Sequence, residues 1–157
     1  MEGSGSLYRL GGWLGVAAAL ALAPSAAADP TPYVRLPSTI CQADVDSVAC
    51  QGVFPDAPVD PCISPKCPEV MHMDQAVVDP SGLFQWRDAN IGLPGAAGRG
   101  WFVLDASQTY RVNGWTVQRN DDDNTTFTND ATGHGMTLEV LGDRGPAGEI
   151  QTAVRPF

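Results

Sequence analysis

Thioether and imidazole side chains fall in two short groups of the sequence. After the initial methionine, the remaining Met and both His are Met71, His72 and Met73 in one group and His134 and Met136 in the other. Met sulfur and His nitrogen together favour Cu(I), and side chains two residues apart on a strand project to one face. These five residues form a candidate copper site. The alternative interpretation places the methionines in the core and leaves the histidines as polar contacts.

A zinc site competes for part of the same region. Cys62, Cys67 and His72 are separated by four intervening residues each time, a spacing that structural zinc sites allow. In an oxidising compartment, however, the thiols form disulfides before they serve as ligands. We therefore expect no cofactor, with copper as the alternative.

Signatures of hydrolases are absent from the sequence. No Gly-x-Ser-x-Gly motif surrounds Ser81, and no His-Glu-x-x-His motif occurs. Two carboxylates could cleave a glycosidic bond, and the candidates for such a pair are Asp88, Asp105, Asp130 and Glu139. Surface carboxylates are the usual case, so we expect a protein that is not an enzyme.

Four cysteines, Cys41, Cys50, Cys62 and Cys67, predict two disulfides. Three connectivities are open, and we favour neighbouring pairs, each stabilising by roughly 2 to 3 kcal/mol. A single helix over residues 41–50 would hold Cys41 and Cys50 about 13 Å apart, beyond the roughly 7 Å that a bridge tolerates. Either that helix breaks or these two cysteines do not pair.

The first 28 residues are typical of a cleaved secretory signal. Arg9 precedes an apolar run from Leu10 to Ala23, and Ala26 and Ala28 come directly before Asp29. A run of about 14 residues is shorter than the roughly 20 that a membrane-spanning helix needs. We expect a protein that is secreted or held in the cell envelope and is free of the membrane after cleavage.

The charge of the chain excludes some partners. There are 9 basic and 18 acidic residues, and removing 1–28 leaves the net charge at −9 because Glu2 and Arg9 cancel. Such a surface repels nucleic acid and anionic lipid. We expect binding to neither.

Composition divides residues 29–157 near residue 75, although the two parts are expected to form one domain. Residues 29–75 are rich in proline and cysteine, which predicts a loop segment stapled by disulfides, with a short helix over Thr39–Ala49 and Ser38 as its cap. Residues 76–157 have short apolar runs separated by turn residues, which predicts strands. The fold class that follows is mainly β, a small antiparallel sandwich or open barrel.

The predicted strands differ in their patterns of apolar residues. Leu83–Trp86 and Trp101–Leu104 are continuous runs typical of buried strands, whereas 136–140 and 150–154 alternate. Asn113-Gly114 predicts a tight hairpin or a bulge between two alternating segments.

The acidic run Asp121-Asp122-Asp123 does not fit a helical calcium loop. Counting from Asp121, the sixth and twelfth positions are Thr126 and Thr132, where glycine and a carboxylate are needed. The run predicts a solvated hairpin tip.

Three features of the chain are shared with a group of exported proteins. Ala26-Ala27-Ala28 before Asp29-Pro30, the preference for Arg over Lys, and the segment from Asn129 to Met136 resemble small exported proteins of mycobacteria and related actinobacteria, a group of unknown function. The resemblance implies a location outside the cytoplasm and assigns no site residue.

Taken together, these features favour an extracellular interaction or structural domain whose partner is a protein or an envelope polymer. Copper binding and a small secreted hydrolase are the alternatives. The sequence does not fix an oligomeric state.

Overall fold

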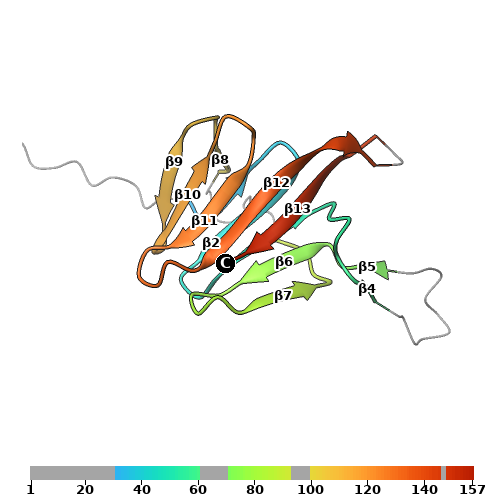
Figure 1. Ribbon diagram of the computed structural model, residues 1–157. Helices are drawn as coiled ribbons and strands as arrows, with labels where there is room; N and C mark the ends of the chain where they lie inside the picture. Colours follow the sequence, from blue (N-terminus) through green and yellow to red (C-terminus); the bar gives the residue numbers. More distant parts are fainter. Residues whose placement is uncertain (1–30, 61–70, 93–99, 146–147) are drawn as a thin grey trace, which may run out of the picture.

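A computed structural model describes residues 31–60, 71–92, 100–145 and 148–157. These residues form two facing β-sheets and one short β-ribbon (Figure 1). The first sheet has the strand order β7-β6-β3-β2-β1-β8, with β1 Tyr33–Arg35, β2 Thr39–Asp44, β3 Ser47–Gly52, β6 Gln75–Val78, β7 Phe84–Arg87 and β8 Phe102–Val103. The second is a meander with the order β13-β12-β11-β10-β9, with β9 Thr109–Val112, β10 Trp115–Arg119, β11 Thr125–Asn129, β12 Gly135–Arg144 and β13 Ile150–Pro156. The ribbon pairs β4 Val59–Asp60 with β5 Met71–His72.

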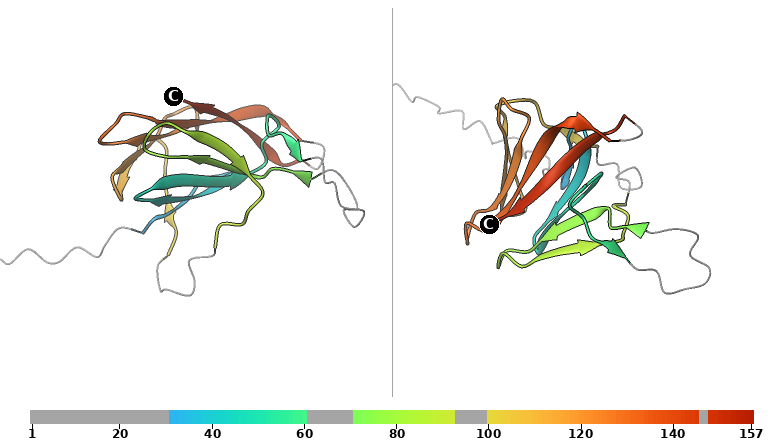
Figure 2. Two further views of the ribbon diagram at one scale, coloured as in Figure 1. Left: turned by 90° about the horizontal axis from the view of Figure 1, so that it is seen from below. Right: turned by 45° about the vertical axis from the view of Figure 1, so that its right-hand side comes forward.

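The core lies between the two sheets (Figure 2). Alternating residues of each strand point inward, and the largest of them, Trp115 and Phe127, are fully buried. The indole Nε1 of Trp115 donates to the carbonyl oxygen of Asp44 at 2.8 Å, which links the second sheet to the first. The expected mainly β fold is confirmed, and the two sheets do not close into a barrel.

The helix expected over Thr39–Ala49 is wrong, because these residues form the β2–β3 hairpin at the centre of the first sheet. Thr39, Cys41 and Ala43 are buried and alternate with more exposed residues, which is the period of a strand. Cys41 and Cys50 are register partners and form a disulfide with a Cα–Cα distance of 4.1 Å. This neighbouring pair is therefore confirmed, and its geometry requires the extended conformation.

Residues 29–75 also contain β1 and the β4–β5 ribbon, so this proline-rich part supplies half of the first sheet. Proline is kept out of the strand interiors: Pro32 and Pro37 flank β1, and Pro55 and Pro58 lie between β3 and β4. Cys62, Cys67 and the expected signal 1–28 lie outside the described residues.

The two apolar runs, the first of which Gln85 interrupts, overlap β7 and β8, yet the expectation that these strands are buried is wrong. Both are edge strands of the first sheet. Phe84 and Trp86 pack against the core, whereas Leu83 is 56% exposed and Val103 is 60% exposed. An apolar run of four residues does not distinguish an edge strand from a central one.

Both predicted turns in the second sheet are confirmed. Val112 pairs with Trp115 across Asn113 and Gly114, whose φ angles are 50° and 80°, as a tight two-residue hairpin requires. Asp121 to Asp123 form the exposed tip between β10 and β11. There the Oδ1 atom of Asn120 accepts from the amides of Asp122 and Asn124. Within the described residues, no helix is long and apolar enough to cross a membrane.

The buried disulfide leads to a stability prediction. Replacing both Cys41 and Cys50 with Ala should lower the free energy of unfolding by about 2 to 3 kcal/mol, because the unfolded chain regains loop entropy. Urea denaturation followed by tryptophan fluorescence measures this loss. An unchanged midpoint and slope would contradict the role given to this bridge.

Candidate functional site

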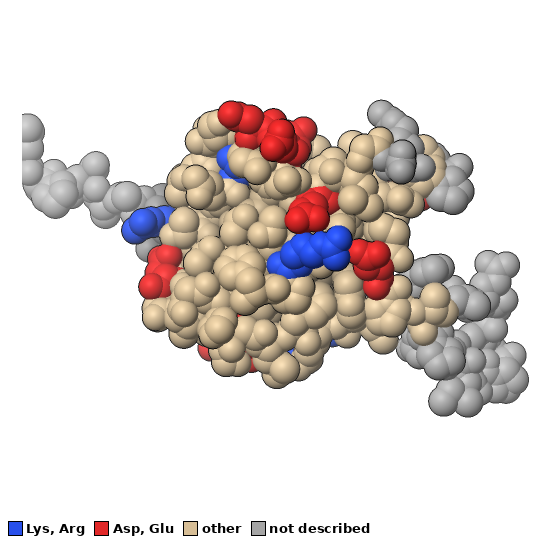
Figure 3. All heavy atoms as spheres, in the orientation of Figure 1, with Lys and Arg blue, Asp and Glu red and all other residues tan. Residues whose placement is uncertain are grey.

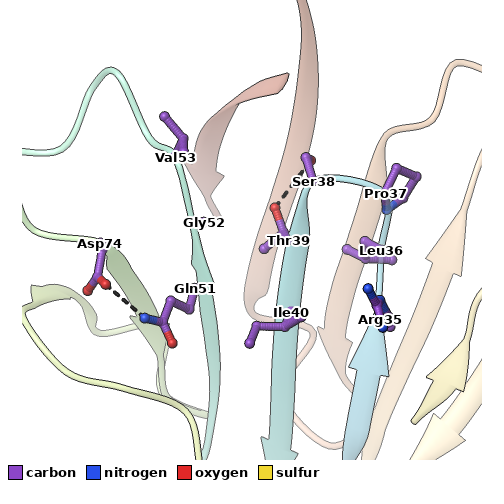
Figure 4. Close-up of a pocket in the computed structure, with 10 residues that line it drawn as sticks. All are labelled: Arg35, Leu36, Pro37, Ser38, Thr39, Ile40, Gln51, Gly52, Val53 and Asp74. Atoms are coloured by element: carbon purple, nitrogen blue, oxygen red, sulfur yellow. Dashed lines mark hydrogen bonds between the residues drawn. The ribbon is translucent and has the colours of Figure 1, made fainter. Parts of the chain in front are cut away.

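Three adjoining surface cavities surround the turn between β1 and β2. The central cavity, of about 490 Å³, is lined by this turn, by the end of β3 and by Asp74 (Figure 4). It shares Gly52, Val53 and Asp74 with an acidic cavity of about 480 Å³. On its other side it shares Arg35, Leu36 and Pro37 with an arginine cavity of about 320 Å³. We take the three neighbouring cavities together as the candidate site and call the surface that they line the groove.

A polar network forms one wall of the central cavity. The Nε2 atom of Gln51 donates to Asp74 Oδ2 at 2.8 Å and to Asn90 Oδ1 at 3.0 Å. The Oε1 atom of Gln51 accepts from the backbone amide of Ile91 at 2.9 Å. In Figure 4 the Gln51 and Asp74 side chains point toward each other across the cavity wall. Because every polar atom of the Gln51 amide is engaged, it holds the Asp74 carboxylate in one orientation.

The two sheets are tied together beside this network. The hydroxyl groups of Ser38 and Thr152 lie 2.9 Å apart, and the amide of Thr152 on β13 donates to the carbonyl oxygen of Val53 at 3.1 Å. Val53 therefore has its backbone fixed while its side chain is 41% exposed. This contact brings the end of β3 against Glu149 and Gln151, which line the acidic cavity.

At the other end, the arginine cavity lies between the sheets. The Nη1 atom of Arg119 donates to Leu104 O at 2.7 Å, and its Nη2 atom pairs with Asp123 at 2.6 Å. Among the described residues, the buried Nε atom of Arg119 has no hydrogen-bond acceptor. Arg35 lines the same cavity and is exposed.

The groove therefore has opposite charges at its two ends, with Asp74 and Glu149 in one cavity and Arg35 and Arg119 in another. The face of the molecule seen in Figure 3 has a different pattern of charged side chains from the groove. Acidic side chains gather over the turn between β10 and β11, and basic and acidic side chains lie close together over β12 and β13. Glu139 and Arg155 form one such pair, with Arg155 Nε 3.4 Å from Glu139 Oε2.

The residues predicted for copper lie in different environments. Met136 is fully buried in the core, and Met73 packs against the core from its border. His134 is exposed, with its ring Nδ1 3.3 Å from Phe157 O. The side chains of Met71 and His72 lie outside the described residues. Met136 and His134 therefore fit the alternative interpretation of a core methionine and a polar contact.

The Gly133-His134-Gly135 segment is explained by close packing. The ring of His134 lies against Gly82, where an added Cβ would come within 3.0 Å of the ring. A Cβ on Gly135 would overlap Phe127 O, on the neighbouring strand. Gly133 has a φ of 77°, which favours glycine. These residues close the turn between β11 and β12.

The candidate carboxylates of a hydrolase lie at different strands of the fold, after β7, after β8, after β11 and within β12. Asp88, Asp105 and Asp130 are exposed, and Glu139 pairs with Arg155. Within the described ranges, no three His, Cys, Asp or Glu side chains are grouped so that they could hold a metal ion. Hydrogen bonds from the Ser81 hydroxyl and from the amides of Leu83 and Ser81 lower the pKa of Asp79, but Asp79 caps the β6–β7 turn away from the groove.

The residues of the groove were not predicted from the sequence. Gln51 and Asp74 lie 23 positions apart, and neither belongs to a motif. The feature of the sequence that could have indicated them is a polar residue beside an apolar strand segment. Gln51 lies at the end of β3, and Asp74 comes directly before β6.

Comparisons with protein-family models, with curated proteins and with solved structures gave no match.

The contact at Gly135 yields a prediction with a matched control. Gly135→Ala should destabilise the protein by on the order of 3 kcal/mol, because the new methyl group overlaps the backbone of β11. Gly142→Ala, also on β12, has no atom within 4 Å of the added Cβ and should be close to neutral. Thermal unfolding of the two variants measures the difference. Equal melting temperatures would refute this explanation of the glycine.

Proposed function

We propose that this chain is a secreted or envelope-associated binding module without enzymatic activity, and that its ligand occupies the groove around the β1–β2 turn. The single observation that carries the proposal is that three neighbouring cavities share lining residues on both sides of the central one. Ligand sites in proteins are typically concave, largely preformed and about 300 to 1,000 Å³ in volume. A module of this kind recognises part of an extracellular protein or an envelope polymer.

The rigidity of the groove supports binding. Its walls are strand ends and a short turn, and the turn is closed by a 2.9 Å hydrogen bond from Leu36 N to Thr39 O. The bonds from Thr152 to Val53 and Ser38 fix the two sheets at this point. A site that is held before binding loses little conformational entropy when the ligand enters.

The disulfide and the signal-like segment support the proposed location. Cys41 and Cys50 are bridged, and disulfides persist in oxidising compartments. Binding is preferred to catalysis because the described carboxylates of the groove, Asp74 and Glu149, are accompanied by no His or Cys in the cavities. Binding needs only shape and a few fixed polar groups, which the groove supplies.

A fragment screen tests this proposal. Two-dimensional NMR of the ¹⁵N-labelled protein against a library of several hundred fragments should give shift changes that cluster at residues 35–40, 51–55 and 73–74. Val53→Trp should abolish most of these hits, because the indole fills the junction of the central and acidic cavities. Hits that cluster elsewhere, or no hits, would contradict the proposal.

Val45→Trp is the matched control. Val45 is 68% exposed and lies in the turn at the opposite end of the β2–β3 hairpin. The same substitution there should leave the fragment hits unchanged. If both variants lost them, the effect would come from general destabilisation, and the groove would lose its support.

A further inference from the structure

The outer edge of β7 is unpaired. β7 is the last strand of the first sheet and lies at the lower rim of the molecule in Figure 1 and in the right-hand view of Figure 2. The amide of Asp79 donates to Leu83 O at 3.1 Å, and hydrogen-bonded pairs alternate along an antiparallel ladder. The backbone groups of Phe84 and Trp86 therefore point away from β6, and among the described residues nothing bonds to them. We propose that β7 pairs with β7 of a second copy of this chain, joining the two first sheets edge to edge.

The strand is self-complementary when it runs antiparallel to its copy about a two-fold axis at Gln85. Phe84 of each copy then lies opposite Trp86 of the other. These are the residues with unpaired backbone groups, so each such pair exchanges two backbone hydrogen bonds. The rings of Phe84 and Trp86, whose centroids are 5.2 Å apart within one copy, gain an aromatic neighbour across the interface. A two-fold contact of this kind closes a dimer and does not propagate.

The side chains on the outer face of β7 also complement one another in this register. Arg87 comes opposite Leu83 of the other copy, which is 56% exposed, so its hydrocarbon stem can cover an apolar side chain. Asp79 is the partner of Leu83 on β6 and lies on the same face, two strand spacings or about 10 Å from Arg87 of the other copy. Arg87 has no carboxylate partner within the described residues. The pairing therefore brings opposite charges near each other and sets no like charges face to face.

The other edges of the two sheets are less suited to pairing. On β13, the amide of Thr152 already donates to Val53 O, and Pro156 has no amide hydrogen. β8 has only two residues. β9 exposes Thr109 and Arg111, so pairing there would cover polar side chains. Proline, charge and short length are the usual protections of an edge strand. β7 instead offers a four-residue edge beside an exposed apolar side chain.

The dimer presents two grooves on one side. Gln51 lines the central cavity and pairs with Gln75, which pairs with Arg87, so these three side chains lie on the same face of the sheet. A two-fold axis perpendicular to the sheet keeps this face on the same side in both copies. This consequence, unlike the pairing itself, rests on the proposed function. Two grooves on one side suit a ligand of repeated units, such as an envelope polymer, because the second contact is intramolecular.

Cysteine cross-linking tests the pairing at its symmetry axis. The two copies of residue 85 would form a pair without hydrogen bonds, about 4.5 Å apart between Cα atoms, which a disulfide can span. Gln85 and Arg87 are both exposed, so Gln85→Cys and Arg87→Cys should keep the fold. Under mild oxidation Gln85→Cys should form a covalent dimer at least roughly tenfold faster than Arg87→Cys, because the two copies of residue 87 lie about 14 Å apart.

The bond must join the introduced sulfur of one copy to that of the other, which peptide mapping checks. A Gln85→Cys dimer that forms no faster than the Arg87→Cys dimer would overturn the proposal.

Sedimentation equilibrium of the oxidised protein measures the pairing without a cross-link. The contact is short, so we expect a reversible dimer whose fraction rises with concentration. Leu83→Lys sets a like charge opposite Arg87 of the other copy and should weaken the dimer roughly tenfold. Val103→Lys, at a comparable exposure of 60% on β8, should leave it unchanged. A monomer at every concentration up to about 1 mM, or the same dimer strength in both variants, refutes the pairing of β7.

Failure of this proposal is distinguishable from failure of the binding module. Cross-linking needs no ligand, and the fragment screen needs no dimer. A monomer that still gives fragment hits in the groove would refute the pairing alone.

Discussion

The buried pairing of Cys41 with Cys50 is the constraint on which the rest of this structure depends. The bridge joins directly opposed residues of β2 and β3 at the centre of the six-stranded sheet. A slip by one residue would exchange the two faces of a strand, moving Ile40 and Gln42 toward the core in place of Cys41. The fixed register therefore decides which side chains reach the core and which reach the groove.

The groove is a consequence of this register. Thr39 lies opposite Gly52, so the β1–β2 turn and the end of β3 meet at one end of the hairpin. Gln51 then faces outward, where it holds Asp74 and Asn90, and Val53 receives the hydrogen bond from Thr152 on the second sheet. The second sheet is also anchored to the opposite end of the hairpin, where Trp115 donates to Asp44 O. Two contacts at the two ends of one hairpin thus set how the sheets face each other.

Local patterns in the sequence predicted the second sheet well. Asn113-Gly114 has the backbone requirement of a tight hairpin, and the alternation around it identifies β9 and β10, because both signals act within a few residues. The first sheet was harder to predict from the sequence. Proline density suggested loops over residues 29–75, yet prolines border the strands, and the same apolar spacing allowed a helix at Thr39–Ala49. Only the pairing of Cys41 with Cys50, a contact between strands, separates the two interpretations.

The candidate site was harder still to predict, because its residues come from distant parts of the chain. Asp74 reaches Gln51 through the pairing of β6 with β3, and β13 reaches Val53 through contact between the sheets. Rare residue types drew attention to His134, Met136 and Met73 instead. Their positions follow from packing: Met136 fills the core, and His134 lies over Gly82. The rarity of a residue type in a sequence does not distinguish a metal-binding side chain from one that packs in the core.

A crystal structure of the oxidised protein soaked with the fragments that bind it in solution tests the central claim most directly. We expect electron density for these fragments in the groove around the β1–β2 turn, against the walls formed by that turn and by the end of β3. Density for the fragments at other sites only, with the groove filled by water, would contradict the claim.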